Sequence, residues 1–303
     1  MDTFVIEPKG PFSLEEAALF GFGQRHDTSF DGTMRLAFCV DGYRDQAGVS
    51  VTQGDDGLVR GTIWNDAGGA PQAIVAQVAR VLSLDHDATG YQALGDQDPV
   101  LARLMAVAPG LRPPLFYSPY EAALWAVISM RRPGATAEKW RARLSQAAGF
   151  GCEVAGQAMW AVPTPGAIID LGPEGVAAAA GIEPARAERV VGVARAAQAG
   201  ALDAATVAAL ASQSEDEARA ALRAIPGIGP FYADLIVIRA AGVTDVFPLN
   251  EPRLLTTLGR LYDRPGPLAP KEAERLAEAW RPWRTWVAVL CRAAGPRLLG
   301  ITV

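Results

Sequence analysis

The pattern of apolar and polar positions divides the chain into an N-terminal third with strand and helix signals and a remainder dominated by helical periodicity. In the first part, apolar residues alternate with polar ones or form short runs, separated by Asp/Gly turns such as residues 54–57. This pattern predicts an antiparallel meander with strands at 33–40, 49–53 and 58–64. Helices are expected at 71–84 and 101–107, and a short one follows a capping box of Ser13 and Glu16.

A proline-rich segment at residues 109–114 is the predicted boundary between the two parts, because a helix cannot continue through it. We therefore expect an α+β domain with an antiparallel sheet at residues 1–113 and an all-α region at residues 114–303. Strand signals nearly vanish after Ser118, which is expected to cap the first helix of this region. The predicted helices span residues 118–130, 136–148, 164–171, 184–198, 203–211, 215–224, 230–241, 251–261, 270–279 and 283–294.

The composition is that of an ordinary globular protein, with 303 residues of which 50% are hydrophobic and 20% are charged. The net charge of −5 argues against a general polyanion binder, but the charge is distributed unevenly. Residues 1–110 carry 7 Lys/Arg against 15 Asp/Glu, whereas residues 111–303 carry 21 against 18. Either only the second part faces an anionic partner, or the N-terminal surface is acidic without functional meaning.

Cysteine and histidine are too sparse and too scattered for a metal site or a disulfide framework. Cys39, Cys152 and Cys291 form no Cys-x-x-Cys pair, and the histidines are His26 and His86. The first residues lack the pattern of a signal peptide, and no apolar run is long enough to span a membrane. These features predict a cytoplasmic protein without a membrane segment.

The most informative segment is residues 222–258, in which the sequence Ile-Pro-Gly-Ile-Gly joins two predicted helices. Gly227 and Gly229 permit a tight turn and a close backbone approach, and Ile228 is expected to plug the turn into the core. The exposed amides at the start of the following helix form a natural phosphate site. The alternative is a helical hairpin that uses glycine for steric reasons alone.

With its surroundings, this segment resembles the helix–hairpin–helix DNA glycosylase superfamily, specifically the 3-methyladenine DNA glycosylase II (AlkA) type. The matching motifs are the hairpin at 225–229, Asp-Val-Phe at 245–247, Ser-Pro-Tyr-Glu-Ala at 118–122 and Trp-Arg-Pro-Trp-Arg-Thr-Trp at 280–286. The resemblance also covers the N-terminal α+β part, which fits the extra domain of this subfamily. It implies two helical subdomains with a cleft between them, and a monomeric, nucleoid-associated enzyme that binds double-stranded DNA.

The family's catalytic aspartate falls on Glu251, and its polar neighbour falls on Asn250. In this reaction a carboxylate stabilises the cation that develops on the sugar or orients the attacking water. Glutamate places its carboxylate one methylene further out, so catalysis by Glu251 requires a retracted pocket or a bulkier substrate. The alternative is an acid that only complements a helix dipole.

The resemblance also suggests the remaining site residues. Phe231 occupies the position of the Schiff-base lysine of bifunctional members, and the three lysines of the chain lie far from the hairpin in sequence, which favours water as the nucleophile. Met130 and Arg131 stand at the positions of the family's glutamine and apolar wedge. Arg131 there either fills the gap of a flipped nucleotide, binds phosphate or is simply solvated. Phe231 is expected to line the base pocket with Tyr120, Trp283 and Trp286, although a core role for Phe231 is also open.

The residues expected to contact DNA are those of the hairpin and four arginines: Gly227, Ile228, Gly229, Arg131, Arg132, Arg281 and Arg284.

These features predict a monofunctional DNA glycosylase that hydrolyses the N-glycosidic bond of flipped alkylated purines, of the 3-methyladenine type, in base excision repair. No metal or organic cofactor is expected, although the hairpin carbonyls of this family can hold a monovalent cation. Because Glu251 replaces aspartate, two alternatives stay open. One is a DNA-binding homologue that has lost catalysis, and the other is a glycosylase specialised for a bulky adduct.

Overall fold

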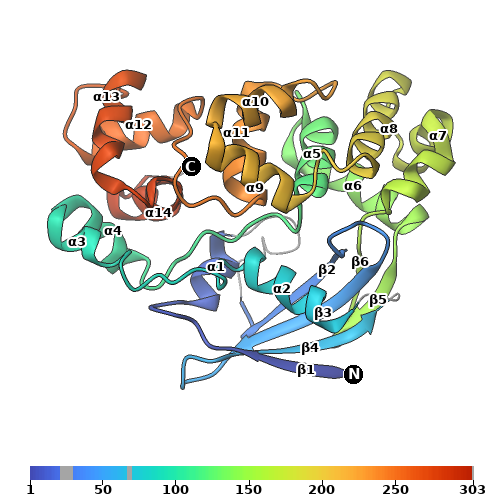
Figure 1. Ribbon diagram of the computed structural model, residues 1–303, viewed down its shortest axis with the longest axis horizontal. Helices are drawn as coiled ribbons and strands as arrows, with labels where there is room; N and C mark the ends of the chain where they lie inside the picture. The colour runs from blue at the N-terminus through green and yellow to red at the C-terminus, as the bar shows by residue number, and fades with distance from the viewer. Residues whose placement is uncertain (21–29, 67–69, 302–303) are drawn as a thin grey trace.

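The computed structural model describes residues 1–20, 30–66 and 70–301, and it combines one antiparallel sheet with many helices, as the α+β prediction requires (Figure 1). The sheet lies at the bottom of Figure 1, and the helices fill the region above it. Its strand order is β1-β4-β3-β2, with every neighbouring pair antiparallel. The strands are β1 (Asp2–Ile6), β2 (Thr33–Cys39), β3 (Gln46–Gln53) and β4 (Val59–Asp66).

Strands β2, β3 and β4 form the predicted meander, whereas β1 is an edge strand that the sequence pattern did not predict. β1 pairs with β4 in a register that sets Phe4 opposite Gly61. The Phe4 ring occupies the space that a Cβ on Gly61 would need. The glycine therefore makes room for the aromatic residue that holds the edge strand in place.

One face of the sheet is covered by helices α1 (Leu14–Phe20) and α2 (Pro71–Val81), which pack on the inward side chains of the strands. The predicted cap of α1 is present, since Ser13 Oγ accepts a hydrogen bond from Glu16 N at 3.1 Å. The Glu16 carboxylate does not complete the box; it pairs with Arg297 at 2.6 Å. This ion pair ties the first helix to the last one.

The other face of the sheet contacts a two-stranded hairpin, which is a departure from the all-α region expected after residue 118. Strands β5 (Gly151–Val154) and β6 (Gln157–Trp160) pair antiparallel, and Val154 and Met159 pack against Ala37 of the sheet. The connecting residues Ala155 and Gly156 both have positive φ, as a tight hairpin turn requires. Strands of four residues are too short for an alternation that a sequence pattern can detect.

The helices form two hydrophobic clusters, which we call the first and second helical clusters. All ten helices predicted after residue 118 are present, and α7 runs beyond its predicted end with a bend at Gly172 and Pro173. The first helical cluster joins α5 (Pro119–Ser129), α6 (Gly134–Ala148), α7 (Pro165–Ala180), α8 (Pro184–Gln198), α9 (Ala204–Gln213), α10 (Glu215–Arg223) and α11 (Pro230–Ala240). The second joins α3 (Ala93–Gln97), α4 (Pro99–Val107), α12 (Pro252–Leu261), α13 (Pro270–Ala277), the 3₁₀ helix η2 (Glu278–Trp280) and α14 (Arg284–Leu299).

The second helical cluster contains residues from both sides of the proline-rich segment 109–114. Leu101 and Leu104 of α4 pack with the last helices of the chain, and Figure 1 shows α3 and α4 beside α14. The proline-rich segment itself is anchored, because the fully buried Arg112 donates hydrogen bonds to backbone carbonyls of residues 9–11, 83 and 86. The domain boundary at residue 113 stays a prediction, and these contacts make the two sides of it one packed structure.

Candidate active site

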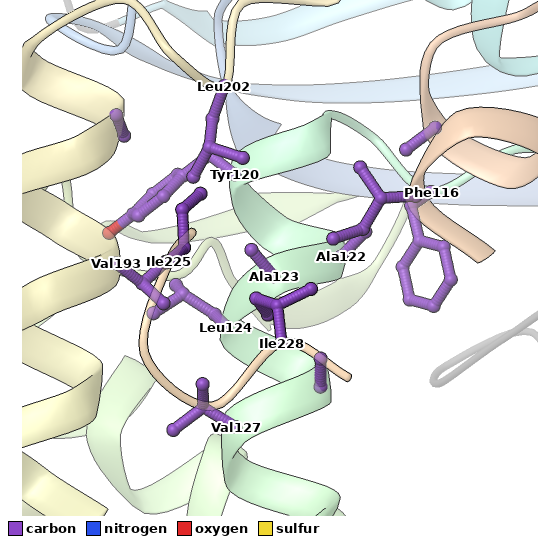
Figure 2. Packing of buried hydrophobic residues seen from close by; sticks show 14 of the residues in the cluster. Phe116, Tyr120, Ala122, Ala123, Leu124, Val127, Val193, Leu202, Ile225 and Ile228 are labelled. Atoms are coloured by element: carbon purple, nitrogen blue, oxygen red, sulfur yellow. The ribbon is translucent and has the colours of Figure 1, made fainter. Parts of the chain in front are cut away.

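The hairpin between α10 and α11 is closed by a hydrogen bond from Ile228 N to Ile225 O at 3.1 Å. Ile228 is buried against α5, and Figure 2 shows it next to Leu124 and Val127. Gly227 has φ +99°, and a Cβ there would come within 3.2 Å of Val127 and of the Arg189 side chain. Both its conformation and its surroundings therefore require glycine at this turn.

Gly229 has a different role, because it sits at the N-cap of α11 in ordinary extended backbone. Within the described residues, no side chain caps this helix, and a Cβ on Gly229 would meet no atom within 4 Å. The N–H groups of the first turn, including those of Phe231 and Tyr232, have no carbonyl partner within the helix. Open space and unpaired amides at a helix N-terminus are what a bound anion needs.

Glu251 is the N-cap residue of α12, although glutamate is an uncommon cap. Its Oε2 accepts a hydrogen bond from Leu254 N at 2.5 Å and pairs with Arg292 Nε at 3.2 Å. Its Oε1 has no hydrogen-bond donor among the described residues, and the side chain is 19% exposed. One carboxylate oxygen is therefore fixed, while the other is free to face a ligand.

A buried hydrogen bond joins the loop of Glu251 to α11. Asn250 Nδ2 donates to Asp234 Oδ2 at 2.7 Å, and Arg219 Nε donates to Asp234 Oδ1 at 2.6 Å. Asp234 is 3% exposed and lies three residues after Phe231, so both residues share one face of the helix. The loop that carries Glu251 is thus held against α11, the helix that follows the hairpin.

Known proteins similar to this chain include several DNA glycosylases, while no family model matches it. The DNA-3-methyladenine glycosylase 2 of Escherichia coli is 28% identical over 186 residues, which cover 61% of this chain and 61% of that protein. The DNA-3-methyladenine glycosylase of Bacillus subtilis is 24% identical over 215 residues, 71% of this chain and 70% of that protein. A solved 3-methyladenine DNA glycosylase from Archaeoglobus fulgidus superposes with a TM-score of 0.77 over 99% of this chain and 100% of that one, at 22% identity.

The two relatives of this chain are both named as 3-methyladenine DNA glycosylases. The resemblance predicted from the sequence is therefore confirmed. The match spans about three fifths of the length of the Escherichia coli relative. The structural likeness, at 22% identity, shows the shared fold.

Two glycosylase motifs of the sequence contact each other. Arg284 Nε donates to Asp245 Oδ1 at 2.7 Å, and Thr285 Oγ1 exchanges hydrogen bonds with the backbone of Val246. Arg284 is 7% exposed and also pairs with Glu215 at 2.9 Å, while Arg281 pairs with Asp245 at 2.6 Å. Both guanidinium groups thus bind carboxylates of the chain itself, so this structure does not present them as free DNA contacts.

The four predicted pocket aromatics do not come together. Phe231 is 42% exposed, and its ring lies T-shaped to that of Tyr232, so it is at the surface rather than in the core. Tyr120 is fully buried and donates to Pro163 O at 2.8 Å. Trp286 is buried and Trp283 half-buried in the second helical cluster, where they pack against Tyr91.

The remaining predicted site residues lie in the loop after α5. Arg131 is exposed with φ +55°, and Arg132 pairs with Glu183 at 3.5 Å while its guanidinium lies 5.5 Å from the Trp140 ring centre. Tyr232 OH forms a hydrogen bond of 2.9 Å with Ser129 Oγ, which links this end of α5 to α11. The loop after α5 therefore lies close to the first turn of α11, which follows the hairpin.

The described part of the chain contains no group of three or more His, Cys, Asp or Glu side chains arranged to hold a metal ion. The three cysteine thiols are free, and His86 Nε2 lies 3.1 Å from Gly242 O. His26 falls outside the described residues. No helix of the described ranges is long and apolar enough to cross a membrane.

Proposed function

We propose that this protein is a monofunctional DNA glycosylase that removes alkylated purines of the 3-methyladenine type from double-stranded DNA by hydrolysis. The observation that carries the proposal is the position of Glu251, whose Oε2 is fixed while its Oε1 is free. The names of the two relatives support this choice of substrate. A monomer is sufficient, because every proposed site residue comes from one chain.

In the proposed reaction, a backbone phosphate lies against the amides at Gly229 and Phe231, which hold DNA without reading its sequence. The damaged nucleotide is flipped out of the helix, and its cationic base stacks on the exposed ring of Phe231. The bond between C1′ and the base nitrogen breaks, and its electron pair leaves with the base. Glu251 opposes the positive charge that develops on the sugar.

Water then attacks C1′ and loses a proton to the carboxylate or to solvent, which leaves an intact abasic strand. Phe231 has no amine, so the route through a Schiff base has no nucleophile at this position. The reaction needs no cofactor. The monovalent cation that the resemblance allows would sit at hairpin carbonyls such as Ile225 O, which accepts one hydrogen bond and keeps a second lone pair.

The test compares wild type with Glu251→Gln and Glu251→Asp on methylated duplex DNA, scored as abasic sites and as strand breaks. Glutamine keeps an acceptor for Leu254 N but removes the charge, so we expect excision to slow by roughly 10²–10³-fold without unfolding. Aspartate keeps the charge and the cap, and measurable excision should remain. Glu272→Gln, an exposed acid on α13, is the matched control.

Each other outcome rejects a specific part of the proposal. Full activity of Glu251→Gln would show that another group is the acid. Binding of DNA without base release by wild type would favour a homologue that has lost catalysis, and release only from bulky adducts would favour the specialised glycosylase. Strand breaks before alkali treatment would contradict the monofunctional assignment.

A further inference from the structure

A depression of about 530 Å³ lies beside the hairpin and is lined mainly by arginine. Its walls come from three elements: the loop after α5, the first turns of α8 and the hairpin glycine Gly227. Four arginines and one glutamate line it, so its formal charge is strongly positive in a chain whose net charge is −5. These arginines differ in whether other groups of the chain already bind their guanidinium groups.

Two of the four arginines have structural partners. Arg186 is buried, and it donates to Val127 O at 2.6 Å and Ile128 O at 2.9 Å, which satisfies the last carbonyls of α5. Glu183 pairs with Arg186 at 3.1 Å and with Arg132 at 3.5 Å, so its carboxylate is neutralised by these two arginines. Both guanidinium groups also lie close to the Trp140 ring centre, Arg186 at 5.3 Å and Arg132 at 5.5 Å.

Arg131 and Arg189 have no carboxylate within ion-pair distance among the described residues. Arg189 extends from α8 so that its Cδ would lie 3.2 Å from a Cβ on Gly227, which places its stem directly against the hairpin. Arg131 is exposed and also lines the depression. Two uncompensated guanidinium groups therefore line a hollow that is continuous with the hairpin.

We propose that this depression is a second phosphate subsite, in which Arg189 and Arg131 bind the DNA backbone next to the phosphate held by the hairpin amides. Guanidinium groups match phosphate oxygens with paired hydrogen bonds, and most contacts that position a protein on DNA go to phosphates. Arg186 and Trp140 keep the loop in place but do not bind. This inference rests on the proposed DNA glycosylase function and adds Arg189, which no sequence motif indicated.

The test measures the affinity of the full chain for duplex DNA between 50 and 200 mM salt by fluorescence anisotropy. Arg189→Met keeps the stem that packs on Gly227 but removes the charge. Each lost phosphate contact lowers the slope of log affinity against log salt by about 1, so Arg189→Met and Arg131→Met should each flatten it by that amount. Arg189→Lys should keep the slope of wild type.

Arg195→Met is the matched control, because Arg195 is exposed on the same helix, has no ion pair within the described chain and lies away from the depression. Its slope should equal that of wild type. An unchanged slope for Arg189→Met, in a wild type that binds DNA with strong salt dependence, would overturn the subsite and leave the glycosylase function standing. A wild type that shows no salt-dependent DNA binding would instead reject the DNA function itself.

Discussion

The buried carboxylate of Asp234 is expected to stabilise both the fold and the position of the loop that carries Glu251. It accepts hydrogen bonds from Arg219 Nε at 2.6 Å and from Asn250 Nδ2 at 2.7 Å, and its side chain is 4% exposed. In Asp234→Ala, the Asn250 amide loses its acceptor and the loop before Glu251 loses its link to α11. We therefore expect a loss of stability and a slower reaction from a single substitution.

The size of the expected loss in the free energy of unfolding follows from the burial of the Asp234 carboxylate. Removing one partner of a fully buried ion pair costs about 3–5 kcal/mol. Arg219 is 18% exposed and keeps a second carboxylate, Glu215, at 3.1 Å, so the expected cost of Asp234→Ala is lower, about 2–3 kcal/mol. Asp216 offers a matched control, because it pairs with the same Arg219 at 3.5 Å but is 98% exposed. Asp216→Ala should cost at most about 0.5 kcal/mol.

Urea denaturation gives the free energy of unfolding of wild type, Asp234→Ala, Asp234→Asn and Asp216→Ala. Asparagine keeps the shape and one acceptor, so its cost should lie between the two alanine variants. Base release at saturating DNA should fall for Asp234→Ala by more than its unfolded fraction explains, and it should be unchanged for Asp216→Ala. Equal costs for the two alanine variants would refute the argument from burial.

Two further predictions concern the hairpin glycines and the thiols. Gly227→Ala should lose about 1–3 kcal/mol in urea denaturation, because φ is +99° and neighbours lie at 3.2 Å, whereas Gly229→Ala should stay folded and weaken DNA binding in anisotropy. Wild-type affinity in Gly229→Ala would place the phosphate elsewhere. Burial raises the pKa of the Cys39 and Cys291 thiols, so a thiol reagent at pH 8 should label the half-exposed Cys152 first. Equal labelling rates for the three thiols in the folded protein would contradict their burial.

Helices and strands whose apolar residues recur at a regular spacing were predictable from the sequence. Short or half-exposed strands were not. The strands of the meander and the ten helices after residue 118 repeat an apolar spacing for long enough to be recognised. β1 has five residues with only partial burial, and β5 and β6 have four each. Their stability comes from pairing and packing with distant residues such as Gly61 and Ala37, which a local pattern does not contain.

The residues of the candidate site also differ in whether the local sequence could indicate them. Glu251 and the hairpin follow from motif spacing, because they lie within one continuous segment. Asp234 acts through a hydrogen bond to a residue 16 positions away, and its only sequence signal is an acid in a helix whose other charged residue is Arg239. Tyr120 and Trp286 are aromatic residues within family motifs, but the structure buries both, and burial depends on the tertiary packing.

The arginines show why net charge is a poor guide to a DNA-binding surface. Of the 28 basic residues, 25 are arginine, and composition cannot separate those that are free from those that are paired. Arg284 lies in a family motif and is neutralised by Asp245 and Glu215, whereas Arg189 lies in none and has no acid partner among the described residues. A phosphate near the hairpin meets the local field of Arg189 and Arg131, because charges more than about 10 Å away are screened at 0.1 M salt. The total of −5 combines −8 in residues 1–110 with +3 in residues 111–303, so it does not argue against binding there.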